Sequence, residues 1–140
     1  MAPIRTFLCF DFGLSNIGVA VGNTLIGQAR PIAILPASNG KPDWLTVQAL
    51  VDEWNPSALV VGNPLGESGE ATELSEKAAR FARQLHGRLS LEVKLCDERF
   101  SSKEAKSRAK DAGHKGDYAK QPIDDLAAAI ILESYLQLEA

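Results

Sequence analysis

Cysteine is scarce in this sequence of 140 residues, and only Cys9 and Cys96 are present. Each lies inside an apolar run, which favours a small buried side chain over a redox or metal-binding group. The two histidines, His86 and His114, have no partner at metal-ligand spacing. The sequence therefore gives no indication of a zinc site or a redox-active thiol.

A long apolar run is also lacking. No stretch approaches the ~18 apolar residues of a membrane-spanning helix, and no secretory signal opens the chain. We therefore expect a protein of the reducing cytoplasm with no membrane partner. A strong excess of one charge is absent too, because the net charge is only −3, and this argues against a protein that coats nucleic acid non-specifically.

The composition that is present is ordinary for a globular protein, but its charge is sorted by segment. Hydrophobic residues make up 45% and charged residues 24%, so the chain can bury a core as a single domain spanning 1–140. Residues 99–120 hold seven Lys or Arg against three Asp or Glu, whereas residues 121–140 hold four acids and no Lys or Arg. Binding of nucleic acid through a local basic patch therefore stays open.

The first half of the pattern predicts strands. Apolar runs at residues 6–12, 17–22 and 28–35 are separated by short connections, which is typical of an antiparallel meander. Pro31 places the third run at a sheet edge or a strand end, because proline donates no hydrogen bond to a neighbouring strand.

Helices and two further strands follow. Asp43 is a suitable N-cap for the first helix, and Gly87 is a suitable stop for the second. The predicted segments are a helix at 43–55, a strand at 58–62, a helix at 71–86, a strand at 91–96, and helices at 101–111 and 123–138. This order predicts an α/β fold with a mixed five-stranded sheet and helices on both faces.

Three acidic positions stand out as candidates for chemistry. Asp11 interrupts an apolar strand, Asp97 and Glu98 end another strand, and Asp124 and Asp125 open the last helix. Carboxylates gathered at one edge of a sheet repel one another unless a cation joins them, and Mg²⁺ prefers carboxylate and phosphate oxygens. Two such ions about 4 Å apart can activate water for phosphodiester hydrolysis.

Each acid also has a structural explanation when it is taken singly. Asp11 would cap a turn, the acids at residues 97–98 would pair with Arg99, and the acids at residues 124–125 would be favoured by the helix dipole. Spacing alone leaves these explanations open.

Four motifs, in order and over nearly the whole chain, resemble the YqgF (RuvX) family. They are residues 11–20 (DFGLSNIGVA), 60–64 (VVGNP) with the Gly/Ser loop that follows, 97–102 (DERFSS) and 123–128 (IDDLAA). The resemblance implies an RNase H-like fold related to the RuvC resolvases. It also implies a nuclease, mostly described as processing the 5′ end of pre-16S rRNA and earlier as a Holliday junction resolvase.

Carried over to this sequence, the resemblance implies a catalytic triad of Asp11, Glu98 and Asp124 that also binds the metal, Mg²⁺ or Mn²⁺. In the related resolvases the second acid lies on the strand that here ends at Gly62 and Asn63. Glu98 would replace that acid from a neighbouring strand. Asn63 stands where Leu is common in the family.

The basic segment after the proposed Glu98 is the predicted nucleic-acid-binding region. Arg99 is suited to hold a phosphate through two parallel hydrogen bonds, although a surface ion pair explains it equally well. The lysines that follow would otherwise form a solvated face. The candidate contacts to the backbone are Arg99, Ser102, Lys103, Lys106, Lys110 and Lys115.

Other functions compete with a pre-rRNA nuclease. The Asp-x-Gly-x-x-x-x-Gly pattern that starts at Asp11 also resembles the phosphate loop of the actin and sugar-kinase fold. Those proteins close two domains around ATP, whereas this chain has the length of one. A Holliday junction resolvase that binds branched DNA and a non-catalytic RNA-binding assembly factor also compete with the nuclease. We expect a monomer or a weak homodimer.

Overall fold

A six-stranded sheet forms the centre of the molecule. The computed structural model describes residues 3–66, 68–97, 107 and 123–139. The strands are β1 (Thr6–Asp11), β2 (Asn16–Asn23), β3 (Ala29–Ser38), β4 (Lys41–Pro42), β5 (Ala58–Asn63) and β6 (Glu92–Asp97). Their spatial order is β4-β3-β2-β1-β5-β6. The pairs β1–β2, β2–β3 and β3–β4 are antiparallel, whereas the pairs β1–β5 and β5–β6 are parallel.

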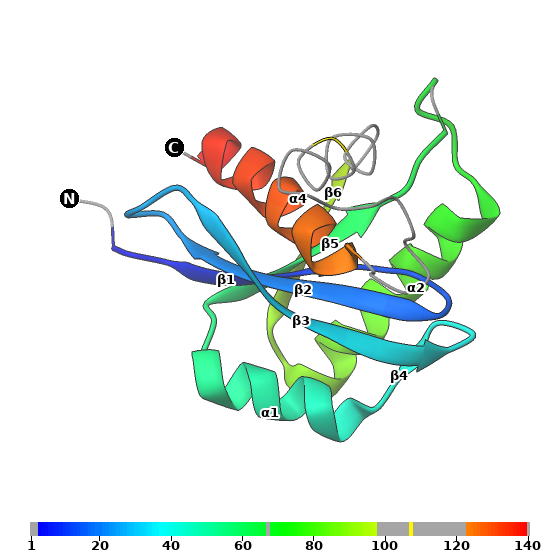
Figure 1. Cartoon of the computed structure of the whole chain (residues 1–140), viewed down its shortest axis with the longest axis horizontal. Coiled ribbons are helices and arrows are strands. Elements are labelled where there is room, and N and C mark those ends of the chain that lie inside the picture. Colours follow the sequence, from blue (N-terminus) through cyan, green and yellow to red (C-terminus); the bar gives the residue numbers. More distant parts are fainter. Residues whose placement is uncertain (1–2, 67, 98–106, 108–122, 140) are drawn as a thin grey trace.

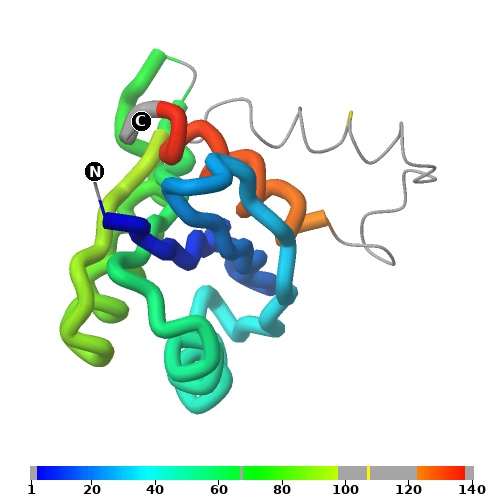
Figure 2. The backbone as a smooth tube through the Cα atoms, turned by 90° about the vertical axis from the view of Figure 1, so that its left-hand side faces the viewer, coloured from blue at the N-terminus to red at the C-terminus, as the bar shows by residue number. Residues whose placement is uncertain are grey.

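Helices cover both faces of this sheet, as predicted. They are α1 (Trp44–Trp54), α2 (Glu73–Leu89) and α4 (Asp124–Glu139). Helix α4 crosses one face, and α1 and α2 lie on the other (Figure 1). Figure 2, turned by 90°, shows the strands between α1 and α4. The helix predicted at 101–111 lies, apart from Ser107, outside the described residues. In the described part of the chain, no helix is long and apolar enough to cross a membrane.

Strand β1 separates two apolar cores because its side chains alternate between the faces. Leu8 and Phe10 are fully buried against residues of α1 and α2, whereas Phe7 and Cys9 are fully buried against α4. A strand covered on both faces has almost no solvent contact. The continuous apolar run in the sequence reflects this central position.

The prediction of five strands was wrong by one short strand. Asn39 (φ 50°) and Gly40 (φ 79°) both take left-handed backbone conformations and form a two-residue turn between β3 and β4. Successive positive φ angles match the twist of a tight hairpin, and Asn-Gly is the pair that tolerates them best. The hairpin extends β3 to Ser38. Among the described strands, Pro31 is paired only with Ala20 of β2, and β4 pairs with β3 only at Ala37 and Ser38, so the predicted edge position is confirmed.

The helix ends agree with the prediction except at Gly87. The carboxylate of Asp43 accepts a hydrogen bond from the amide of Leu45 (3.0 Å), as expected of an N-cap. Helix α2, however, continues through Gly87 to Leu89 and ends at Ser90, which takes the left-handed conformation. Leu89 packs against the core below α2, and this contact favours two more residues of helix.

Candidate active site

The parallel strands bring three polar residues to one edge of the sheet. Asp11 ends β1, Asn63 ends β5 and Asp97 ends β6. Phe10 is in register with Val61, and Asn63 is in register with Asp97, so the three strand ends lie side by side. In open α/β sheets, ligands bind outside the carboxyl ends of such strands.

The first residue of α4 reaches the same edge, directly beside Asp11. Gly18 is the partner of Asp11 in the pairing of β1 with β2. A Cβ atom added to Gly18 would lie 1.9 Å from the carbonyl oxygen of Asp124 and 2.5 Å from the amide nitrogen of Asp125. Paired residues on neighbouring strands are about 5 Å apart. The missing side chain of Gly18 therefore lets the start of α4 rest beside Asp11.

Asp11 also points to the correct face for this meeting. Phe7 and Cys9 contact the α4 side of the sheet, and Asp11 is the next residue of β1 with the same orientation. The structure thus brings together Asp11 and Asp124, two of the three acids in the predicted triad.

Burial raises the pKa of Asp124, which lies partly buried at the start of α4. A backbone hydrogen bond within Asp124 acts in the opposite direction, and the neighbouring charge of Asp125 raises the pKa further. The carboxylate of Asp125 accepts a hydrogen bond from the amide of Leu126 (2.9 Å), so it satisfies a donor of its own helix. The two adjacent acids therefore have different surroundings.

The remaining predicted residues lie outside the described part of the chain. They are Glu98, Arg99, Ser102, Lys103, Lys106, Lys110 and Lys115. Asp97, which precedes Glu98, follows Cys96 on β6, and Cys96 belongs to the core under α4. Because strand residues alternate, Asp97 lies on the face opposite Asp11. Without Glu98, the described residues contain no group of three acids, histidines or cysteines that could hold a metal.

The surroundings of Asp11 and Asp124 nevertheless suit a hard cation. Both residues offer carboxylate oxygens, the donor atoms that Mg²⁺ and Mn²⁺ prefer. A partly buried carboxylate whose pKa is raised by burial gains when a cation replaces the water that it has lost. The residues present thus fit a divalent metal that is completed by a third acid, by water and by substrate.

Asn63 is a polar residue at this edge to which the sequence assigned no role. Its side-chain oxygen is buried and has no hydrogen-bond partner among the residues that the structure describes. Buried acceptors are nearly always bonded, so an unsatisfied one is notable. Its signal in the sequence was an amide at a strand end where the family commonly has Leu.

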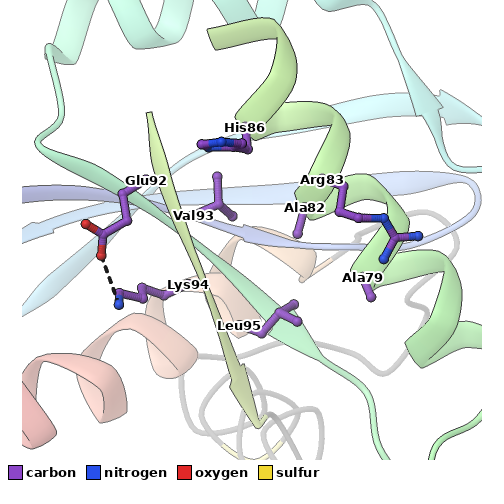
Figure 3. A pocket seen from close by; sticks show the side chains of 8 residues that line it. All are labelled: Ala79, Ala82, Arg83, His86, Glu92, Val93, Lys94 and Leu95. Carbon is purple, nitrogen blue, oxygen red and sulfur yellow. Dashed lines mark ion pairs between the residues drawn. The ribbon is translucent and has the colours of Figure 1, made fainter. Parts of the chain in front are cut away.

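A cavity lined by residues of α2 and β6 lies away from these acids. It has a volume of about 770 Å³ and lies between α2 and the edge strand β6 (Figure 3). Glu92 and Lys94 form an ion pair of 2.9 Å on its β6 side, and alanines of α2 line the opposite wall. Neither Asp11 nor Asp124 lines this cavity, so it does not mark the candidate active site.

Comparison with known proteins identifies the family. The model of the family described as "RuvX: Holliday junction resolvase" matches residues 5–138. The chain belongs to the RuvX family. A relative from Azotobacter vinelandii is 49% identical over 136 residues, which cover 97% of this chain and 96% of the relative. A relative from Chromohalobacter salexigens is 48% identical and covers 94% and 88% of the two chains. Both carry the name "Putative pre-16S rRNA nuclease".

Two resolvases are among the solved structures that share this fold. The RuvC of T. thermophilus, in complex with a Holliday junction substrate, superposes with a TM-score of 0.57 at 16% identity, covering 96% of this chain and 95% of RuvC. The Holliday junction resolvase of fowlpox virus gives a TM-score of 0.53 at 15% identity, covering 96% and 99%. At such low identity these likenesses show the fold alone. The predicted family and RNase H-like fold class are therefore confirmed, and the predicted enzyme class agrees with the names of the relatives.

Proposed function

We propose that this RuvX-family chain is a metal-dependent nuclease that hydrolyses phosphodiester bonds at the 5′ end of pre-16S rRNA. The observation that carries the proposal is the contact between Gly18 and the start of α4, which sets Asp124 beside Asp11. The names of the relatives from Azotobacter vinelandii and Chromohalobacter salexigens support pre-16S rRNA as the substrate.

In this proposal, Asp11, Glu98 and Asp124 hold Mg²⁺ or Mn²⁺. When bound, such an ion supplies an activated water at neutral pH and stabilises the leaving oxygen. Asp11 contributes a ligand fixed by the central strand, whose backbone is paired on both sides. Asp124 contributes a carboxylate that has lost part of its solvation and so favours a cation over water.

The other chain groups would position the substrate. Arg99, Ser102 and the lysines of the basic segment would bind backbone phosphates and leave the base sequence unread. The phosphodiester substrate would therefore approach the carboxyl ends of β1 and β5 from the face of the sheet that α4 covers.

A Holliday junction resolvase is the second candidate, favoured by the description of the family and by the shared fold. A resolvase cuts two strands symmetrically and must therefore act as a dimer. Cleavage of a leader RNA at one site does not require a dimer, so a monomer or a weak homodimer is sufficient for it.

The test compares a pre-16S leader RNA and a four-way DNA junction as substrates, each with Mg²⁺, Mn²⁺ or EDTA. We expect the wild type to cut the leader RNA, EDTA to abolish cleavage, and Asp11→Asn to lose cleavage while it keeps its fold and RNA binding. Asp125→Asn is the matched control, because the side chain of Asp125 accepts a hydrogen bond from the amide of Leu126 in its own helix. This variant should still cut the leader RNA.

Different outcomes would change the assignment. Cleavage of the junction alone, by a dimer, would identify a resolvase. A folded protein that binds RNA without metal-dependent cleavage would be an assembly factor. Wild-type rates in Asp11→Asn would remove the proposed metal site.

A further inference from the structure

A small pocket with three cationic side chains lies on the opposite face of the sheet from Asp11. Its volume is about 170 Å³. Lys41 of β4 and Lys77 and Arg80 of α2 line it, together with the amide side chains of Asn39 and Gln84. We call it the basic pocket. Since no acid is among the described residues that line it, the basic pocket is suited to an anion.

The basic pocket lies next to the candidate active site at the end of β1. Phe12, the residue after Asp11, lines the pocket, and its ring centroid lies 5.3 Å from the ring centroid of Phe81 of α2. Asp11 and Phe12 are adjacent in the chain and face opposite sides of the sheet. The pocket and the two acids are thus back to back at the same end of β1.

The β3–β4 turn is held in place against this strand end. Gly40 donates a backbone hydrogen bond to the carbonyl of Leu14 (2.9 Å), in the loop that follows β1. A Cβ atom on Gly40 would lie 2.6 Å from the ring of Phe12, so only glycine allows this approach. The turn therefore carries Lys41 to the pocket on a backbone that is tied to the loop beside Asp11.

The cations of the basic pocket are available to a ligand. In the described part of the chain, neither Lys41 nor Arg80 takes part in an ion pair. Lys77 lies 3.6 Å from Glu73, whose side chain is 87% exposed. Such an exposed pair one helical turn apart contributes little to stability and is easily exchanged for a stronger anion.

We propose that the basic pocket binds a backbone phosphate of the nucleic-acid substrate, at a position away from the bond that is cut. Arginine with two parallel N–H groups, lysine as a point charge and amide NH₂ groups are the donors that match phosphate oxygens. The volume is too small for a base with its sugar, since pockets for such ligands start at about 300 Å³. The nucleic-acid strand would pass around the end of the β-sheet, with the scissile phosphate beside Asp11.

This inference rests on the proposed function, because it takes nucleic acid as the substrate. The test removes two charges from the pocket with the double variant Lys77→Gln and Arg80→Gln. The control is the double variant Arg83→Gln and Lys94→Gln, which removes two charges from the cavity between α2 and β6. A third variant, Lys41→Gln, tests the pocket from a different element.

Affinity for the leader RNA is measured across a range of salt concentrations, and cleavage is measured as kcat and KM. In the Lys77/Arg80 variant, we expect weaker binding, a salt slope reduced by about 0.7 for each lost phosphate contact, a raised KM and a nearly unchanged kcat. Lys41→Gln should change in the same direction. The Arg83/Lys94 control should behave as wild type, and all variants should melt within about 2 °C of it because the side chains are at the surface.

The outcomes separate the two proposals. If the wild type binds and cuts RNA but the Lys77/Arg80 variant keeps the wild-type salt slope and KM, the basic pocket is not a phosphate site and the proposed function stands. Equal losses in the variant and the control would show a general charge effect and would also overturn the inference. A wild type that binds neither RNA nor the DNA junction would overturn both.

Discussion

At the scale of single residues, Asp11 and Asp124 have different constraints although they lie side by side. Asp11 is fixed by a strand that is hydrogen-bonded on both sides, so its backbone has little freedom. Asp124 is placed by the first turn of a helix, and burial raises its pKa. An ionised Asp124 is therefore less favourable in the folded protein than in the unfolded chain when no cation is bound.

This difference gives a pH-dependent prediction for the metal-free protein. Since the pKa of Asp124 is raised from about 3.8 on folding, its stabilising contribution is complete below that pH and is lost as pH rises through the folded value. Asparagine resembles the protonated acid and does not ionise. We expect Asp124→Asn to melt above the wild type at pH 7 in EDTA, with a difference that shrinks toward pH 4.

The control for this prediction is added metal. Mg²⁺ should raise the melting temperature of the wild type more than that of Asp124→Asn, because ligand binding stabilises only the folded state that binds it. An Asp124→Asn variant that melts below the wild type at pH 7 in EDTA would instead show that the carboxylate has a structural role.

At the scale of secondary structure elements, the contact between β2 and α4 sets the geometry of the candidate active site. The backbone of Asp124 occupies the space of a side chain at Gly18. Position 18 therefore acts on the site through the placement of a helix, although a glycine has no side chain to offer a ligand.

We predict that Gly18→Ala displaces the start of α4, lowers the rate of cleavage about 100-fold and also destabilises the fold. The added methyl group would meet backbone atoms, which cannot rotate away, and overpacking of this kind costs about 1–3 kcal/mol. A shift of about 1 Å in a catalytic group lowers activity about 100-fold. Cleavage rates and urea denaturation of the same preparation would measure the two effects.

Gly87→Ala in α2 is the matched control, because the added Cβ would have no described atom within 4 Å other than its chain neighbours and the backbone of its own helix. Alanine in a helix interior should stabilise the protein by up to about 1 kcal/mol and leave cleavage unchanged. Wild-type cleavage by Gly18→Ala would show that the position of α4 is not critical.

The same scale shows how far the sequence could predict this structure. Strand and helix periodicity located β1, β2, α1 and α4 to within a few residues, and strand-end acids indicated the edge where Asp11 and Asp124 meet. Strand β4 was missed because two residues carry no periodicity, although the Asn39-Gly40 pair is a strong hairpin signal. The helix signal at Gly87 was misread because tertiary packing of Leu89 outweighs a local stop.

The site itself was predictable only in part. The acids are visible because charge within or next to apolar runs is unusual, and family motifs gave them roles that remain predictions. The basic pocket was not predictable, because Lys41 and Arg80 belong to different elements and meet only through the packing of a hairpin on a helix. Asn63 was visible as a departure from the family, whereas its unsatisfied oxygen depends on neighbours that the sequence does not identify.

At the scale of the whole molecule, an acidic protein must attract a polyanion through local regions of positive charge. The net charge is −3, yet seven of the fifteen Lys and Arg residues fall within residues 99–120. Long-range attraction to RNA is therefore weak, and binding depends on contacts that are close and sensitive to salt.

We predict that replacing Lys103, Lys106 and Lys110 with Gln weakens binding to RNAs of unrelated sequence by similar factors. The slope of log affinity against log salt should fall by up to about 2, because fewer counterions are released on binding. Binding titrations at several salt concentrations measure this slope, and the Arg83/Lys94 variant again serves as the control. An unchanged slope would place the nucleic acid on another surface.

The position of α4 after all the strands has a consequence for the synthesis of the protein. During translation, β1 and β2 leave the ribosome long before the helix that covers Phe7, Cys9 and Ala20. A nascent chain that has not reached residue 124 lacks both this cover and Asp124. The step that completes the core is thus the step that delivers the second acid, so an incomplete chain cannot assemble the acid pair proposed to cut the RNA of its own cell.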